Sequence, residues 1–149
     1  MLGVRWRSRE ELRTRLLRAG FDSDQVTEAL AGLEAAGLID DERFAAELVR
    51  SQAGRLSGAR AIRHALRLRG VAPDVAEAAL VQAGDEFDKA VELARRRASR
   101  MRGLPPDVAA RRLSGLLLRR GYGYDLAASA VRAALTDQVP GSDSPEPED

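Results

Sequence analysis

The sequence predicts an all-α protein that forms an elongated, curved array of tandem three-helix repeats, about eight helices in all. Apolar residues recur at spacings of three and four along almost the whole chain, without sustained strand-like alternation. A short motif of arginine, glycine and a large apolar residue recurs three times. Its glycines, Gly20, Gly70 and Gly121, lie 50 and 51 residues apart. A repeat of this length is typical of units that bury their apolar faces by stacking, and it favours a binding protein over an enzyme.

The residues after each glycine keep the same frame. An aspartate follows each glycine by four residues, and an aliphatic residue follows it by ten. The aspartates are Asp24, Asp74 and Asp125, and the aliphatic residues are Leu30, Leu80 and Val131. The three segments are therefore copies of one structural unit.

The first two helices are expected at residues 8–19 and 23–36. Ser8 is the predicted N-cap of the first, with Glu11 three residues on as in a capping box. The inward-facing residues of this helix are expected to be Leu12, Leu16 and Leu17. The second helix stops at Gly37.

The next three helices form the middle of the chain. The third, residues 41–53, follows Asp40, whose carboxylate can accept backbone N–H groups, and it turns Phe44 inward. The fourth, residues 57–69, ends at Gly70, a residue suited to a left-handed cap. The fifth starts near Pro73, because a fixed φ suits a first helical turn.

Three more helices complete the array. The sixth, residues 85–101, is expected to bury Phe87. Pro105 and Pro106 open the seventh, which runs to Arg120, and the eighth spans residues 124–136. The segment beyond it is rich in proline and acidic residues, has little to bury and should be disordered.

These helices predict four parts of the chain. Each complete unit opens with acidic residues and an aromatic, as at residues 40–44 and 85–87. The expected parts are an incomplete first repeat at 1–37, a second repeat at 38–84, a third at 85–137 and an acidic tail at 138–149. The first repeat lacks its opening helix, and Trp6 is a candidate staple over it.

Composition narrows the class of protein further. There is no cysteine, no signal-like apolar segment at the start and no apolar run approaching 18 residues, so we expect a soluble, cytoplasmic protein. We also expect a monomer. The net charge of +1 hides an excess of arginine in the middle, where residues 50–120 hold 16 basic and 7 acidic side chains. This balance of +9 suits an acidic partner, although a GC-rich genome also enriches arginine.

Two segments carry a family resemblance. The run Gly37-Leu38-Ile39-Asp40-Asp41-Glu42-Arg43-Phe44-Ala45, followed by residues 58–71 and the later Leu117-Leu118-Arg119-Arg120-Gly121-Tyr122, resembles the RecX regulatory proteins. The resemblance implies a helical array that lodges in the groove of a RecA nucleoprotein filament and restrains filament growth, ATP hydrolysis and strand exchange during DNA repair. Members usually carry one more helix before residues 7–9, which leaves the packing at this end of the chain open.

The candidate partner-binding residues are exposed arginines on three predicted helices. They are Arg60, Arg63, Arg67, Arg96, Arg97, Arg100, Arg111, Arg112, Arg119 and Arg120. A second set belongs to the repeated motifs and is expected to serve as caps and core. This set is Gly20, Phe21, Asp40, Asp41, Phe44, Gly70, Gly121 and Tyr122.

The remaining polar and aromatic residues that could suggest a metal or nucleotide site have structural explanations. His64 is the sole histidine and is expected at the surface, without the paired ligands of a metal site. The acids at residues 40–42 suit a helix start and need no ion. Residues 121–124 are expected to cap a helix, although Tyr122 and Tyr124 could stack on a base. We expect no catalytic residue, no metal and no cofactor.

Two alternatives remain at this point. A helix-turn-helix or winged-helix DNA-binding module at residues 9–38 would use residues 23–36 as its recognition helix, but a wing requires two strands after Ile39, where the pattern is helical. That helix also carries acidic residues and no arginine, which disfavours phosphate contact. A helical scaffold without a nucleoprotein partner is the other alternative, and weak binding to DNA is left open.

Overall fold

The computed structural model describes residues 7–137, and every regular element in that range is a helix. The helices are α1 (Arg9–Arg18), α2 (Ser23–Ala35), α3 (Asp41–Gly54), α4 (Ala59–Leu68), α5 (Pro73–Leu80), the short 3₁₀ helix η1 (Val81–Ala83), α6 (Glu86–Ala98), α7 (Pro106–Arg119) and α8 (Tyr124–Thr136). The all-α prediction is confirmed. Trp6 and the acidic tail, residues 138–149, lie outside the described residues.

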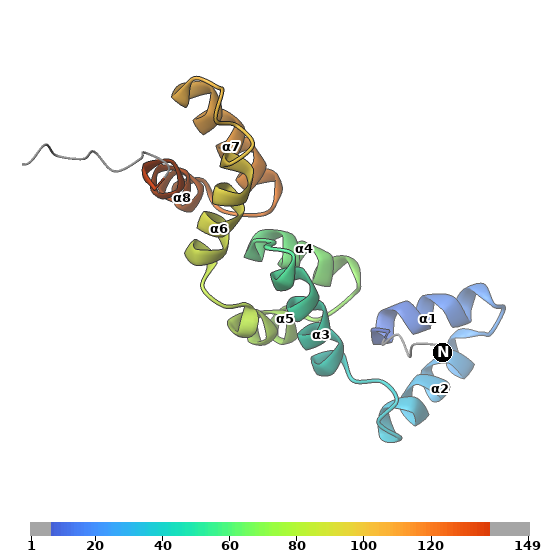
Figure 1. Ribbon diagram of the computed structural model, residues 1–149. Coiled ribbons are helices and arrows are strands. Elements are labelled where there is room, and N and C mark those ends of the chain that lie inside the picture. The colour runs from blue at the N-terminus through green and yellow to red at the C-terminus, as the bar shows by residue number, and fades with distance from the viewer. Residues whose placement is uncertain (1–6, 138–149) are drawn as a thin grey trace, which may run out of the picture.

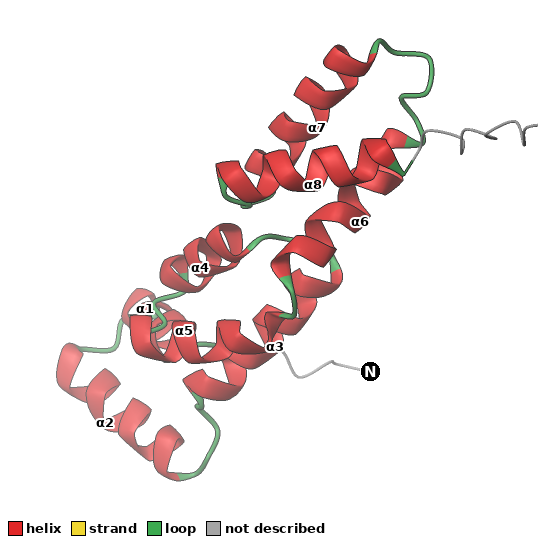
Figure 2. Ribbon diagram, turned by 90° about the vertical axis from the view of Figure 1, so that its left-hand side faces the viewer, coloured by secondary structure: helices red, strands yellow, loops and turns green. Residues whose placement is uncertain are grey.

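The helices form three groups along one long axis (Figures 1 and 2). The pair α1 and α2 lies at one end, α3 to α5 lie in the middle, and α6 to α8 lie at the other end. The extensive helix pairs fall within these groups, as in α6 against α8 and α3 against α5. The protein is therefore an elongated array. The strands that a winged helix needs after Ile39 are absent from residues 7–137, because α3 begins at Asp41.

The helix starts follow local capping rules. Ser8 accepts a hydrogen bond from the Glu11 backbone N–H at 3.1 Å, and Asp40 accepts one from Arg43 at 3.1 Å, so both predicted N-caps are confirmed. The reciprocal capping box occurs at α2, between Asp22 and Gln25, and not at α1 as expected. The carboxylate of Glu11 points instead to the second unit, where it pairs with Arg69.

Each helix group has its own buried cluster. The first is small, with three buried residues, Val26, Leu30 and Ile39. The second has nine, from Phe44 to Ala83, and the third has thirteen, which include Leu113, Leu117 and Tyr122. Leu56, from the loop after α3, belongs to the third cluster. The core is thus distributed along the array and is thinnest at the α1 and α2 end.

Two expected core residues at that end are exposed. Leu17 is 38% exposed and Phe21 is 50% exposed. The equivalents of Phe21 in the later units, Val71 and Tyr122, are buried, and the glycines before them contact the preceding unit, at Glu10 and at Ala61. The turn at Gly20 has no such neighbour among the described residues, since a Cβ placed there would meet nothing within 4 Å.

The aromatic residue stands at different distances from the N-cap in α3 and in α6, the opening helices of the second and third units. Asp40 and Asp85 are the N-caps of α3 and α6. Phe44 lies four residues after its cap and is buried, whereas Phe87 lies only two after its cap and is 40% exposed. Two residues rotate a side chain by about 200° around a helix. Lys89 therefore occupies the buried position that Phe44 holds, and the expectation for Phe87 is wrong.

Two joints of the same design connect the units. At the first, the Ser8 hydroxyl donates to the Arg69 carbonyl at 2.5 Å, and the Arg9 backbone N–H donates to Asp41 at 2.9 Å. At the second, the Gly58 backbone N–H donates to the Arg120 carbonyl at 2.8 Å. In both joints the start of a helix in one unit meets the arginine–glycine turn of the next.

The second joint carries further hydrogen bonds. The Tyr122 hydroxyl donates to the Leu56 carbonyl at 2.6 Å, and Arg120 also bonds the Arg55 carbonyl. From α6, Glu86 accepts from the Ala59 backbone N–H at 2.5 Å. Lys89 Nζ donates to the Ser57 carbonyl at 3.2 Å. These contacts fix the arginines of α4 relative to those of α6 and α7.

Candidate partner-binding surface

The α4 face consists of the exposed residues Arg60, Arg63, His64 and Arg67. Their spacing of three and four places them along one side of the helix, as the sequence predicts, and α4 contains no acidic residue. Ile62 and Leu66 on the opposite side are fully buried. The packing of these two residues thus directs the arginines to the surface.

One arginine of the α4 face is already paired. Arg63 Nε lies 2.5 Å from Glu77 Oε1 on α5, and this hydrogen bond raises the pKa of Arg63 and lowers the pKa of Glu77. Both side chains are exposed, so the pair adds little stability. His64 is at the surface as expected, with Nδ1 3.1 Å from Arg67 Nη2. Arg60 and Arg67 have no acidic partner within residues 7–137.

A second basic feature lies between α6 and α7. This α6–α7 groove has a volume of about 260 Å³ and is lined by Arg97, Arg111, Arg112, Arg119, Met101 and Leu116. Gly115 also lines it, and a Cβ added there would approach Arg119 Nη1 to 3.2 Å. The fold therefore brings arginines from two predicted clusters around an apolar strip.

The other candidate arginines differ in their surroundings. Arg96 pairs with Glu92 one turn earlier at 2.5 Å, and Arg100 is exposed just beyond α6. Arg120 is half-buried, and its guanidinium bonds the Arg55 carbonyl in the second joint. Its contacts in the structure hold two units together, in contrast to the solvent-facing arginines of the groove.

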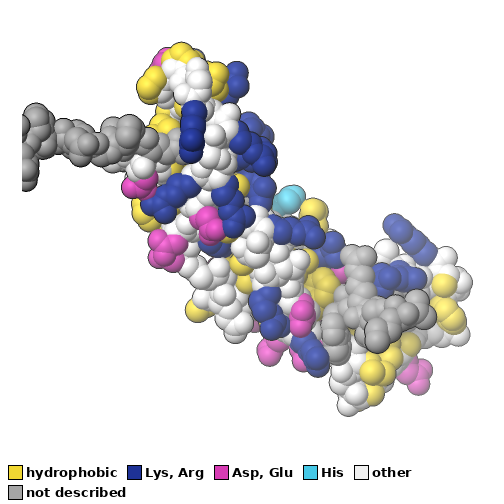
Figure 3. All heavy atoms as spheres, viewed as in Figure 1, with side chains coloured by type: hydrophobic (Ala, Val, Ile, Leu, Met, Phe, Trp, Pro, Cys, Tyr) yellow, Lys and Arg dark blue, Asp and Glu magenta, His cyan; other side chains and the backbone are white. Residues whose placement is uncertain are grey.

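The α4 face and the third unit adjoin at the turn before α8. A Cβ added to Gly123 would lie 3.8 Å from Arg60 Nη2, so the Arg60 side chain reaches this turn. Tyr124, next in the chain, is 72% exposed, whereas Tyr122 is 1% exposed and cannot stack on a base. In the space-filling view, basic side chains gather on the side of the molecule that carries His64 (Figure 3).

Two residues of the second joint were missed by sequence reasoning. Glu86 and Lys89 hold the loop before α4, and burial lowers the pKa of Lys89 against the opposing charge of Glu86. One signal was available, because Lys89 is the single lysine among 24 basic residues. At this buried position the compact ammonium of lysine donates to the Ser57 carbonyl, whereas the planar guanidinium of arginine is larger.

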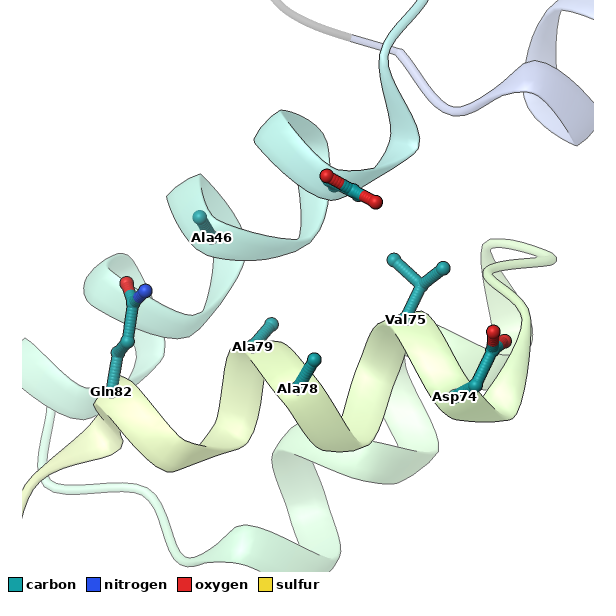
Figure 4. Close-up of a pocket in the computed structure, with 7 residues that line it drawn as sticks. Ala46, Asp74, Val75, Ala78, Ala79 and Gln82 are labelled. Atoms are coloured by element: carbon teal, nitrogen blue, oxygen red, sulfur yellow. The ribbon is translucent and has the colours of Figure 1, made fainter.

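A different kind of pocket lies between α3 and α5. It has a volume of about 330 Å³, with Ala46, Val75, Ala78 and Ala79 along it, and Asp74 and Gln82 toward its two ends (Figure 4). Glu42 also lines it. Over the described range, no group of three histidine, cysteine, aspartate or glutamate side chains could hold a metal ion. No helix among residues 7–137 is both long and apolar enough to cross a membrane.

Comparison with known proteins agrees with the sequence resemblance. The model of the RecX second three-helix domain matches residues 40–80, and that of the third three-helix domain matches residues 84–131. The Mycolicibacterium smegmatis protein named regulatory protein RecX is 40% identical over 147 residues, covering 93% of this chain and 77% of its own length. The Mycobacterium avium regulatory protein RecX is 39% identical over 139 residues, covering 91% and 80%.

Solved structures give the same answer for the fold. The crystal structure of RecX from Lactobacillus salivarius superposes with a TM-score of 0.80 at 25% identity, covering 91% of this chain and 90% of that one. A second structure, titled regulatory protein RecX, gives 0.75 at 23% identity, covering 89% and 66%. The motif at residues 37–45, the repeated units and these matches agree, and the chain belongs to the RecX family of regulatory proteins.

Proposed function

We propose that this protein binds the RecA nucleoprotein filament in its helical groove and restrains the recombinase. Family membership supports a regulatory role, and the arrangement of arginines supports an acidic, extended partner. The observation that carries the proposal is the meeting of the α4 face and the third unit at one turn, where Arg60 reaches Gly123. The α4 face therefore adjoins the unit that carries the α6–α7 groove, and one extended partner can contact both.

The length of the array suits a polymer better than a single protomer. Each unit offers a few exposed arginines, and each such contact is weak in water. Contacts made by two or three units at once add up only where several protomers are held in register, so binding favours the assembled filament. No catalytic group is needed for this mode of action.

Restraint of the recombinase then follows from differential binding. The second joint fixes the α4 face relative to the third unit, which carries the α6–α7 groove, so the array fits best a filament state whose protomers match that spacing. States with a different spacing lose population by the difference in binding free energy. Slower ATP hydrolysis and slower strand exchange are the expected consequences.

The test is a set of charge reversals on the α4 face. Changing Arg60, Arg63 and Arg67 together to glutamate should weaken binding to RecA–single-stranded DNA filaments at least tenfold, measured by co-sedimentation. The matched control reverses three arginines on other helices, Arg13, Arg50 and Arg132, with the same change in net charge. Circular dichroism and urea unfolding check that both variants keep the fold.

The two variants separate a site from a general charge effect. Loss of binding in the α4 variant alone supports the proposal. Equal binding by both variants, or equal loss in both, contradicts the assignment of the α4 face. Naked single-stranded DNA at the same salt concentration serves as a second ligand, because a protein that binds it as tightly as the filament is a DNA-binding protein instead.

A further inference from the structure

A second pocket, which shares the lining residue Met101 with the α6–α7 groove, lies where the described chain ends. This second pocket has a volume of about 410 Å³ and is mostly apolar, with Ala98, Leu104, Ala109 and Leu135 in its lining. Met101 lines both cavities. A chain that leaves α8 therefore begins at the rim of an apolar pocket that leads, across Met101, to a basic groove.

The starting point of that chain is fixed against α6. Asp137, the last described residue, accepts a hydrogen bond from Arg95 Nε at 2.9 Å, and Thr136 lines the apolar pocket. Residues 138–149 follow directly. This segment begins Gln138-Val139-Pro140. Its first apolar residues, Val139 and Pro140, therefore follow within four residues of Thr136, which lines the apolar pocket.

The groove and the segment have opposite charge. Residues 138–149 hold four carboxylates, Asp143, Glu146, Glu148 and Asp149, and no basic residue. In the groove, Arg111 pairs with Asp107 at a loose 3.7 Å, with both side chains exposed. Arg97, Arg112 and Arg119 form no salt bridge with any residue from 7 to 137. Clustered arginines without counter-charges repel one another, and an acidic segment relieves this repulsion.

The length of the segment is sufficient. Asp143 lies six residues after Asp137 and can reach about 20 Å, and Asp149 can reach about 40 Å. The whole of α7, fourteen residues, is about 21 Å long. A tether this short gives an effective concentration in the millimolar range, at which weak charge-assisted contacts are populated. Three prolines in the segment reduce the conformational entropy lost on docking.

We propose that residues 138–149 bind the α6–α7 groove of their own chain, with Val139 and Pro140 at the apolar pocket and the four carboxylates among the arginines. The bound segment competes with any acidic partner for the groove. This competitive role rests on the proposed function, whereas the docking itself does not. A partner that contacts several units at once binds tightly enough to displace the segment. A weak ligand that contacts the groove alone does not displace it.

Docking is tested by a spin label on the segment. The chain has no cysteine, so Ser144→Cys gives one attachment site for a nitroxide. We expect amide NMR signals of Met101, Gly115 and Leu116 to broaden in the full chain at low salt, and signals of α3 and α5 to stay sharp. The matched control carries the same label with Asp143→Asn, Glu146→Gln, Glu148→Gln and Asp149→Asn. In that control the broadening should fall at least fivefold.

The outcomes decide the docking and the competition separately. Groove signals that broaden equally in both labelled chains, or not at all, overturn the docking. The neutralised chain should also bind RecA–single-stranded DNA filaments about 3- to 10-fold more tightly than the parent, because it spends no time with the groove occupied. Equal affinities overturn the competition, and absence of filament binding by both chains refutes the proposed function while the label still reports on docking.

Discussion

The glycines that end α4 and α7 meet two requirements at once. Gly70 and Gly121 have φ values of 75° and 94°, in the left-handed region that other residues rarely adopt. Each also touches the preceding unit, since an added Cβ would lie 2.4 Å from Glu10 Cβ or 2.5 Å from Ala61 Cβ. Gly20 shares the left-handed backbone, with φ of 99°, but faces open space.

This difference predicts unequal effects of one substitution. Gly20→Ala should lower the free energy of unfolding by about 1 kcal/mol, the strain of a left-handed alanine. Gly121→Ala should lower it by about 2 to 4 kcal/mol, because it adds a clash in the second joint to the same strain. Urea unfolding of the two variants measures both. Equal decreases in the free energy of unfolding would mean that the second joint accommodates the added Cβ at no cost, which would contradict the prediction.

Tyr122 gives the second joint a dependence on alkaline pH. Burial first, and then the charge of Glu86, raise the pKa of the Tyr122 hydroxyl to about 12 from an ordinary value of 10.0, with Arg120 opposing. The native state therefore keeps its proton at a pH where the unfolded chain releases it. The stabilisation is complete below pH 10 and is lost as the pH rises from 10 to 12.

The test compares the wild type with Tyr122→Phe between pH 9 and pH 11.5. Near neutral pH the variant should be less stable by about 1 to 3 kcal/mol, because the buried Leu56 carbonyl loses its donor. The wild-type advantage should shrink as the pH rises above 10. Lys89, whose pKa burial lowers, contributes equally to both proteins and cancels from the difference. An advantage that grows with pH would contradict the assignment.

At the scale of elements, the helix pair α1 and α2 has the least support. Its cluster contains three buried residues, and a Cβ added at Gly20 would meet no atom within 4 Å in the described chain. Hydrogen bonds from Ser8 to Arg69 and from Arg9 to Asp41, with the Glu11–Arg69 ion pair, hold it to the middle of the array. Regions with few buried contacts open locally at low free energy.

Native-state hydrogen exchange should therefore rank the three helix groups. We expect amides of α1 and α2 to exchange first, at free energies below that of global unfolding, and amides of α6 and α8 to exchange last. Mass spectrometry of deuterated peptides separates the groups. Protection of α2 equal to that of α8 would show that the units unfold as one.

Most elements follow from signals that lie within them, and for that reason they were predictable. Apolar spacing placed the eight α helices to within a few residues, and Ser8, Asp40 and the glycines marked their ends. The exposure of Phe87 does not follow from its likeness to Phe44, because the distance from the N-cap decides which position of the helix is buried. The exposure of Phe21 depends on a neighbouring unit, which no local pattern reports.

At the scale of the whole molecule, the candidate surface was only partly predictable. The arginines of α4 were expected on one face, because helical spacing is local. Sequence could not place Arg97 beside Arg112, since their helices meet through packing, nor could it assign Arg120 to the second joint. Exposed arginines and joint-forming arginines look alike in sequence. Only the arrangement of the units distinguishes them.

The most direct test of the account is a titration into a RecA ATPase assay on single-stranded DNA. If the array bridges filament protomers through the α4 face and the α6–α7 groove, rising concentrations should lower the steady-state rate to saturation. The variant of Arg60, Arg63 and Arg67 should need at least tenfold more protein for half the effect. A rate that stays unchanged at concentrations well above that of RecA would contradict the central claim.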